Sequence, residues 1–162
     1  METGSLAAAL EAEHQEIDAG IAAFAAAPGD LRPLGRAIGA LRRHIYLEEE
    51  FLFPMLRDAE PALTAPVLVM LREHAQIWDC LDALDQTAAA DPEAARASLR
   101  PLTVQLLHHN LKEEKILYPR ADVLLPAAAA TRLRAFLDTG QLPDGWVCIK
   151  ARPGSGGHER TG

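Results

Sequence analysis

Two histidines in the sequence are each followed, one helical turn later, by a pair of glutamates. The first segment reads HIYLEEEFLFP from His44, and the second reads HNLKEEKILYP from His109. Two further histidines, His14 and His74, lie in the matching segments EHQEI and EHAQI, and each of these precedes one of the longer segments. Because both patterns occur twice and in the same order, the sequence indicates two helical hairpins of one design.

The chemistry of these segments is that of a metal site. Residues i and i+4 lie on one face of an α-helix, so each HxxxE histidine should point the same way as the glutamate that follows it. Buried without partners, these groups would cost several kcal/mol, whereas imidazole and carboxylate together suit iron, manganese or zinc. One glutamate from each hairpin can bridge two metals, which leaves room for an oxo or hydroxo bridge and a small external ligand. The predicted ligands are His14, His44, Glu48, His74, His109 and Glu113.

Helices must hold these ligands at one height. Proline-containing breaks at residues 28–30, 60–61 and 91–92 divide the chain, and apolar side chains between the breaks recur at steps of three and four residues. Successive histidines lie about equally far from the break between them. Antiparallel helices joined by short loops would therefore bring all four histidines to the same height in the bundle. The expected helices cover residues 5–27, 34–58, 62–89, 92–118 and, as a short fifth helix, 127–138.

The fold that follows is all-α, an up-down-up-down four-helix bundle. We expect the bundle domain to cover residues 1–138 and an irregular tail, rich in glycine and proline, to cover residues 139–162. Alanine and leucine dominate the composition, which favours helices over strands. The length of 162 residues suits one domain with a sizeable core.

Charge and composition argue against several other classes of protein. The net charge of −7 argues against nucleic-acid binding, because phosphate recognition requires a basic face. No uninterrupted apolar run approaches the roughly 20 residues of a membrane span, and the first residues do not read as a signal peptide. Cys80 and Cys148 form no CxxC pair and are expected to be reduced thiols. We therefore expect a cytoplasmic protein.

The repeated segments resemble the hemerythrin HHE cation-binding family over roughly residues 5–120. The resemblance implies a hemerythrin-like bundle around a non-haem di-iron centre that binds O2, NO or peroxide, with the four histidines as terminal ligands and Glu48 and Glu113 as bridges. Oxygen-carrying members have a fifth histidine where this chain has Trp78, and the corresponding position after His14 is Asp18. The set of four histidines and two glutamates is more similar to iron-sulfur-repair di-iron proteins and to bacterial HHE proteins.

Three functions are compatible with such a centre. The leading one is a di-iron protein that binds a small diatomic or oxidant for sensing, storage, scavenging or stress defence; a sensor role would require a protein partner. The alternative is a di-iron oxidoreductase that activates O2 and oxidises an unknown organic substrate, which an organic-sized cavity beside Glu48 and Glu113 would favour. The third is a purely structural role, in which zinc stabilises the bundle or the residues hold no metal.

Several residues near the predicted ligands have a simpler interpretation. Glu49 and Glu114 follow the proposed bridges by one residue and point about 100° away on an α-helix, so we interpret them as surface charges. We interpret Tyr118 as a ring that seals the core, with a phenol near the centre as the alternative. Asp18 is interpreted as a solvated residue, with an extra ligand or a hydrogen-bond acceptor as the alternative. Packing or structural roles are assigned to Trp78, Cys80 and His108.

Overall fold

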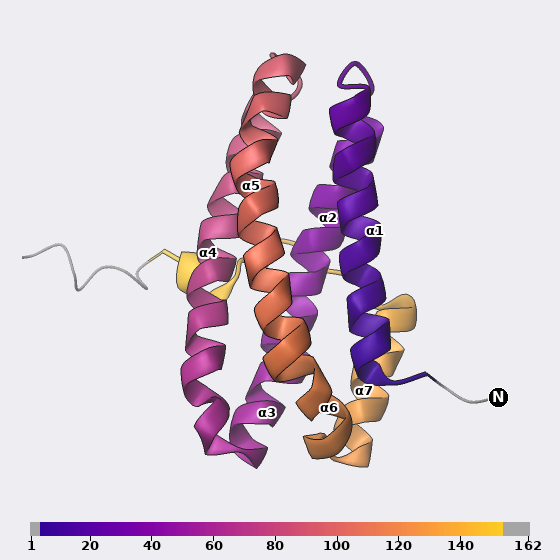
Figure 1. Ribbon diagram of the computed structural model, residues 1–162, viewed down its shortest axis with the longest axis vertical. Helices are drawn as coiled ribbons and strands as arrows, with labels where there is room; N and C mark the ends of the chain where they lie inside the picture. Colours follow the sequence, from indigo (N-terminus) through magenta and orange to yellow (C-terminus); the bar gives the residue numbers. More distant parts are fainter. Residues whose placement is uncertain (1–3, 154–162) are drawn as a thin grey trace, which may run out of the picture.

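Four long helices, α1 (Leu6–Ala26), α2 (Arg32–Leu47), α4 (Thr64–Thr87) and α5 (Pro92–Lys112), run side by side along the molecule (Figure 1). The computed structural model describes residues 4–153, which contain no strand, and this confirms the predicted all-α fold. None of the helices in this part of the chain is long and apolar enough to cross a membrane. In chain order the elements are α1 (Leu6–Ala26), α2 (Arg32–Leu47), the π-helix η1 (Glu48–Leu52), α3 (Phe53–Ala59), the 3-10 helix η2 (Pro61–Leu63), α4 (Thr64–Thr87), α5 (Pro92–Lys112), the π-helix η3 (Glu113–Leu117), α6 (Tyr118–Leu124), α7 (Ala127–Thr139) and the 3-10 helix η4 (Ile149–Ala151).

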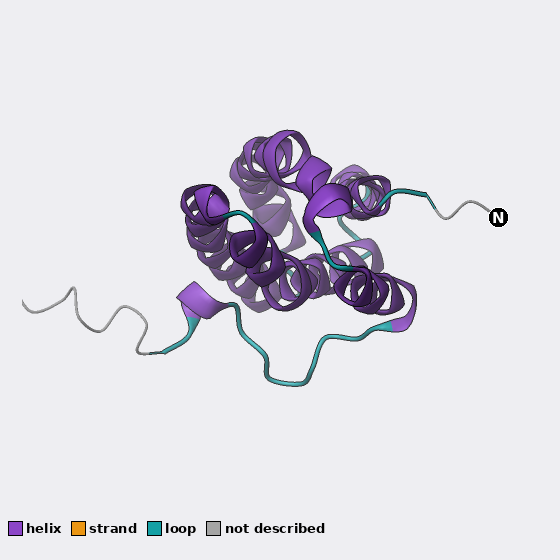
Figure 2. Cartoon of the chain, turned by 90° about the horizontal axis from the view of Figure 1, so that it is seen from below, coloured by secondary structure: helices purple, strands orange, loops and turns teal. Residues whose placement is uncertain are grey.

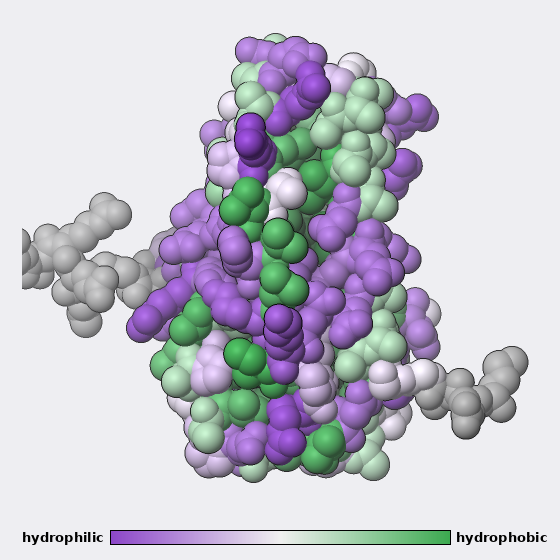
Figure 3. All heavy atoms as spheres, viewed as in Figure 1, coloured by the Kyte–Doolittle hydropathy of each residue, from purple (hydrophilic) through white to green (hydrophobic). Residues whose placement is uncertain are grey.

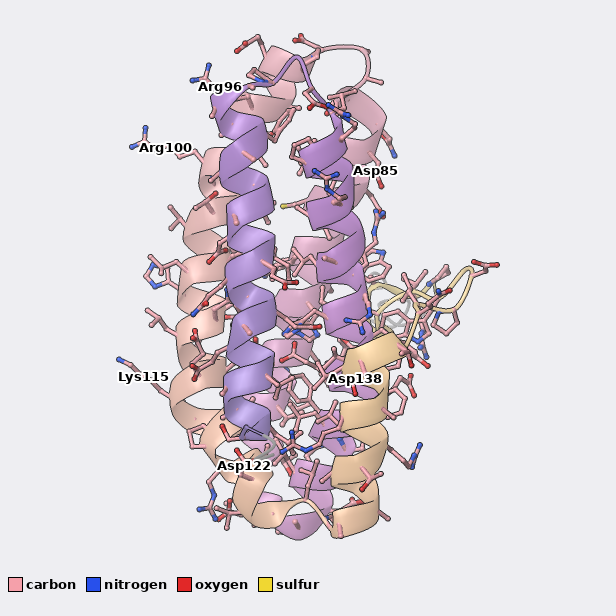
Figure 4. The ribbon with its side chains drawn as sticks, turned by 90° about the vertical axis from the view of Figure 1, so that its right-hand side faces the viewer. Asp85, Arg96, Arg100, Lys115, Asp122 and Asp138 are labelled. Atoms are coloured by element: carbon pink, nitrogen blue, oxygen red, sulfur yellow. The ribbon has the colours of Figure 1, made fainter. Side chains whose placement is uncertain are left out.

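Polar side chains satisfy the free N–H groups at the helix starts. The Ser5 hydroxyl accepts a hydrogen bond from the N–H of Ala8 at 3.0 Å at the start of α1. The Asp91 carboxylate accepts one at 3.1 Å from the N–H three residues on, at the start of α5. Asp122 of α6 lies near the N-terminus of α1 (Figure 4) and accepts a hydrogen bond from the N–H of Leu6 at 2.8 Å. An acidic group at the N-terminus of a helix also interacts favourably with the helix dipole.

The second and fourth predicted helices are not continuous α-helices, because each contains a π-helical turn. In η1 the N–H of Phe53 donates to the carbonyl of Glu48, five residues back, and in η3 Tyr118 does the same to Glu113. A proline follows each donor residue, and in an α-helix a proline lacks the N–H and its ring clashes with the carbonyl four residues earlier. The wider turn accommodates the proline, and it rotates the following residues relative to a regular α-helix.

Apolar side chains pack in two clusters, one on each side of the middle of the bundle. The first cluster lies between α1, α2, α4 and α5, and the second lies where α3, α6 and α7 join the long helices. In α1, Leu10 belongs to the second cluster and Ile17 to the first, with His14 between them. The same order occurs in α4 around His74. The predicted ligands therefore occupy the boundary between two apolar regions.

The segment after α7 packs on the bundle. Its backbone is largely irregular, as predicted, and it passes outside the helices until η4 contacts α4 (Figure 2). Cys148 is fully buried in the first apolar cluster. The ring centroid of Trp146 lies 5.0 Å from that of Tyr46 and 5.5 Å from that of Trp78. The predicted short helix over 127–138 corresponds to α7, and the part of the tail from 154 to 162 lies outside the described residues.

Replacing Trp146 by alanine should lower the free energy of unfolding by about 2 kcal/mol, because its contacts with Tyr46 and Trp78 are lost. Chemical denaturation followed by far-UV circular dichroism measures the change. The control is Val123→Ala, at a position that is 68% exposed, and it should alter the same quantity by less than about 0.5 kcal/mol. Equally small effects of both substitutions would contradict the packing of this segment.

Candidate metal centre

The structure brings all six predicted ligands together in the middle of the bundle. They come from α1, α2, η1, α4, α5 and η3, and none exposes more than 4% of its surface. Their nitrogen and oxygen atoms form two groups, and within each group the atoms lie within 4.8 Å of one another. One group contains Glu48, His74, His109 and Glu113, and the other contains His14, His44 and Glu113. Because Glu113 belongs to both groups, the arrangement suits two neighbouring cations.

Each of the two inner glutamates lies between histidines of both hairpins. The Glu48 carboxylate lies 3.6 Å from Nε2 of His44 in its own hairpin and 3.2 Å from Nε2 of His74 in the other. Glu113 repeats the pattern. It lies 3.3 Å from Nε2 of His109 in its own hairpin and 3.2 Å from Nε2 of His14 in the other. A carboxylate in this position could bridge two metal ions, and the imidazoles on either side could provide further ligands.

A second set of glutamates contacts the outer side of the histidine rings. The hydrogen bonds join Nδ1 to a carboxylate oxygen in the pairs His44–Glu13 at 2.9 Å, His74–Glu49 at 2.7 Å and His109–Glu73 at 2.9 Å. Because a carboxylate can only accept, Nδ1 of each ring carries a proton and donates it. In the neutral ring the lone pair is then on Nε2, which faces the centre, as metal binding by histidine requires.

These outer glutamates follow the same internal repeat as the inner residues. Glu13 and Glu73 belong to the two EHxxI segments, and each contacts the HxxxEE histidine of its own hairpin. Glu49, the second glutamate of the first HxxxEE segment, contacts the EHxxI histidine of the other hairpin. Its counterpart Glu114 lies 3.7 Å from Nδ1 of His14, too far for a hydrogen bond. Reasoning from the sequence missed Glu13 and Glu73, although their repetition beside each histidine was an available signal.

The interpretation of Glu49 as a surface charge is wrong. Its side chain is only 2% exposed, and the oxygen that does not contact His74 accepts a hydrogen bond from the N–H of Ile149 at 2.9 Å. Both the wider turn of η1 and the C-terminal segment that covers this side of the bundle account for its burial. Glu114 keeps 32% of its side chain exposed and is partly solvated.

The interpretation of Tyr118 as a ring that seals the core describes only half of its role. The ring belongs to the second apolar cluster, but the hydroxyl lies in the centre. Its oxygen is 2.9 Å from Nε2 of both His14 and His44, and it donates to Glu48 at 2.8 Å. On a regular α-helix, Tyr118 would lie about 140° around the helix from Glu113. The π-helical turn of η3 reduces this angle, and the sequence pattern of an α-helix does not reveal it.

Four other nearby residues lie outside the centre. Asp18 and His108 are exposed. Trp78 is buried in the first apolar cluster, and Cys80 packs against the same cluster. None of these four residues belongs to the groups that could hold a metal ion within residues 4–153.

The electrostatics of the centre favour a bound cation. Burial raises the pKa of Glu48, and the charge of Glu113 raises it further. Burial also acts to raise the pKa of Glu113, but His109 outweighs it and holds that pKa well below its usual range. Burial would lower the pKa of His109, yet Glu113 raises it to about 10. A metal ion that binds to His109 must therefore displace a proton from this ring.

Several buried atoms of the centre have no hydrogen-bond partner within the described part of the chain. They include Oε1 of Glu48, Nε2 of His74 and Oε2 of Glu113. A buried polar atom without a partner costs about 1–3 kcal/mol. All three atoms are electron-pair donors, and those of Glu48 and His74 lie only 3.2 Å apart. Cations would satisfy these atoms, so the residues present fit a metal centre.

Replacing Glu49 by glutamine should weaken metal binding about 10- to 100-fold, because a neutral amide supports the His74 ring less well than a carboxylate. Competition for Co²⁺ with a chromophoric chelator measures the affinity. The neighbouring substitution Glu50→Gln is the matched control, since it keeps an oxygen that can accept from the Trp146 indole N–H. Equal affinities of the two variants would show that Glu49 has no such supporting role.

The chain also matches known proteins. Residues 5–121 match the family model described as the Hemerythrin HHE cation binding domain. Two relatives are the iron-sulfur cluster repair proteins YtfE of Yersinia pestis (strain Pestoides F) and Yersinia pseudotuberculosis serotype O:1b (strain IP 31758), each 32% identical over 98 residues. The alignment covers 54% of this chain and 44% of each relative, so the chain spans less than half the length of these proteins. No solved structure shows a significant match.

The family match covers the four long helices and all six inner side chains of the centre. The buried cluster of histidines and glutamates and the helical bundle that holds it agree with a cation-binding domain. The chain therefore belongs to the hemerythrin HHE cation-binding domain family.

Proposed function

We propose that the chain binds two iron ions in this centre and uses them to capture a small ligand such as O2, NO or peroxide, in sensing, storage, scavenging or stress defence. The observation that carries the proposal is the position of Glu48 and Glu113, each between a histidine of its own hairpin and one of the other. In this assignment both glutamates bridge, and the terminal ligands are His14 and His44 for one ion and His74 and His109 for the other.

Two further facts support iron. A mixture of imidazole and carboxylate ligands is typical of non-haem iron, and the chain belongs to a family named for cation binding. The relatives named above carry iron-sulfur cluster repair in their names, which supports a role in iron chemistry. When bound, iron supplies redox chemistry and open positions for a small ligand.

The residues of the chain prepare the centre for this role. The outer glutamates keep Nε2 of three rings free to bind, and two cations partly neutralise them: Arg43 contacts Glu13 at 2.7 Å, and Lys112 contacts Glu73. The apolar clusters on both sides limit the access of water. We infer that the protein orients the ligands and balances their charge before metal arrives.

The neighbouring histidines of α5 provide a matched test. We expect wild-type protein and His108→Ala, reconstituted with Fe²⁺ without oxygen, to hold two irons per chain and to change their absorption spectrum when NO is added. His109→Ala should hold at most one iron while its far-UV circular dichroism stays unchanged, because His109 is buried in the centre and His108 is exposed. Elemental analysis of the three samples gives the content. Two irons in His109→Ala, or fewer than two irons in wild type, would contradict the proposal.

A groove between α1 and α5 favours a second candidate, a di-iron oxidoreductase that activates O2 and oxidises an organic substrate. The groove has a volume of about 1010 Å³, which is large enough for an organic molecule. His14 lines it, together with apolar side chains such as Ile21 and Leu106, whereas neither bridging glutamate does. Figure 3 shows apolar side chains gathered over α5 and in the hollow beside it. Arg96 and Arg100, which also line the groove, project outward from α5 (Figure 4).

Oxygen consumption separates the two candidates. A small-ligand binder takes up O2 in proportion to its centres and stops, whereas an oxidoreductase continues when an electron donor and a linear alcohol or carboxylic acid are supplied. For the oxidoreductase, Ala22→Trp, which narrows the groove, should lower this compound-dependent uptake without changing NO binding. An oxygen electrode measures both. Uptake that is undiminished in the variant would exclude the groove as the substrate site, and none in wild type would leave small-ligand binding as the function.

A further inference from the structure

The two halves of the centre differ at one repeated position. Phe53 and Tyr118 each lie five residues after a bridging glutamate, and each follows directly on a π-helical turn. The ring of Phe53 stacks on His74 with centroids 5.6 Å apart and an interplanar angle of 19°. Tyr118 instead places its hydroxyl between two histidines of the other half. The half that contains His14 and His44 thus has an oxygen atom that the half around His74 lacks.

The surroundings of this oxygen resemble those of a metal ligand. It is fully buried and contacts Nε2 of His14 and of His44, both at 2.9 Å. It also lies 2.8 Å from Glu48 and 3.3 Å from Glu113. A phenol has one proton and two lone pairs, so it can donate to only one of the two carboxylates. Four metal-binding groups therefore surround a single oxygen that cannot satisfy all of them as a hydrogen-bond partner.

A cation held by His14 and His44 would lie next to this hydroxyl. Both nitrogens that would bind the cation are already in contact with the phenol oxygen, so the cation either coordinates the oxygen or displaces the whole ring. Displacement is costly, because the ring is part of the second apolar cluster and has no exposed surface. Coordination leaves the ring in its place, and a phenolate oxygen is a hard anionic ligand that suits ferric iron.

We propose that Tyr118 is a ligand of the iron ion held by His14 and His44, so that the two irons are chemically unequal. This inference rests on the proposed di-iron function. On binding of the ferric ion, the O–H bond of Tyr118 breaks, an iron–oxygen bond forms and the proton leaves to solvent. No electron is transferred in this step. The other iron, beside Phe53, has no such ligand.

The chain offers a matched control because it contains two tyrosines, Tyr46 and Tyr118. Tyr46 belongs to an aromatic group with Trp146 and Phe136, and it is not part of the metal-binding clusters. Protein loaded with iron and oxidised to the ferric state should show a visible phenolate-to-iron charge-transfer band in wild type and in Tyr46→Phe. The band should be lost in Tyr118→Phe, and iron content should be measured in the same samples.

Resonance Raman spectroscopy of wild type provides a test that does not depend on the Tyr118 variant folding. Excitation in the charge-transfer band should enhance tyrosine ring modes that shift when the protein contains ring-deuterated tyrosine. Two irons per chain without these modes would overturn the role of Tyr118 and leave the di-iron function standing. Absence of iron from wild type would instead overturn the di-iron function. Loss of the tyrosine modes in Tyr46→Phe with the iron retained would show that Tyr46, and not Tyr118, is the ligand.

Discussion

Burial of four imidazoles and two carboxylates between two apolar clusters is the constraint on which the rest of this structure depends. Such groups lose their contact with water on folding, and the fold tolerates them only if each finds a partner. The outer glutamates satisfy the Nδ1 side of three rings. The inner side leaves ring nitrogens and carboxylate oxygens that face one another, and only protons or cations can satisfy both. The centre therefore attracts positive charge because of the way the bundle is built.

The internal repeat explains how one short sequence pattern builds both halves of the centre. The two halves differ where the two copies of the repeat have different residues or different surroundings. The C-terminal segment covers the side of α2 and α4, where Glu49 is buried and Trp78 contacts Trp146. Within residues 4–153, no segment covers the equivalent side, between α1 and α5, and Glu114 and Asp18 line its groove. Asp18 follows His14, and Trp78 follows His74, by one helical turn. One side of the centre is thus sealed while the other opens towards solvent.

Much of this arrangement could be predicted from the sequence, because it depends on helical periodicity. The four long helices and α7 follow from apolar spacing and proline breaks, and the six inner residues follow from the doubled HxxxE and EHxxI segments. The two π-helical turns could not be predicted, since residues were placed by the angle of a regular α-helix. A regular α-helix places Glu49 on the surface, and it favours a sealing role for the Tyr118 ring over the alternative of a phenol near the centre. The groove depends on how far α1 and α5 lie apart, which periodicity does not determine.

We propose that side chains from both hairpins hold two metal ions between them. Anomalous diffraction at the iron absorption edge, from crystals of the iron-loaded protein, tests it most directly. We expect two anomalous peaks about 3.5–4 Å apart, one beside His14 and His44 and the other beside His74 and His109. A single peak, or peaks only on the outer surface of the bundle, would contradict the account.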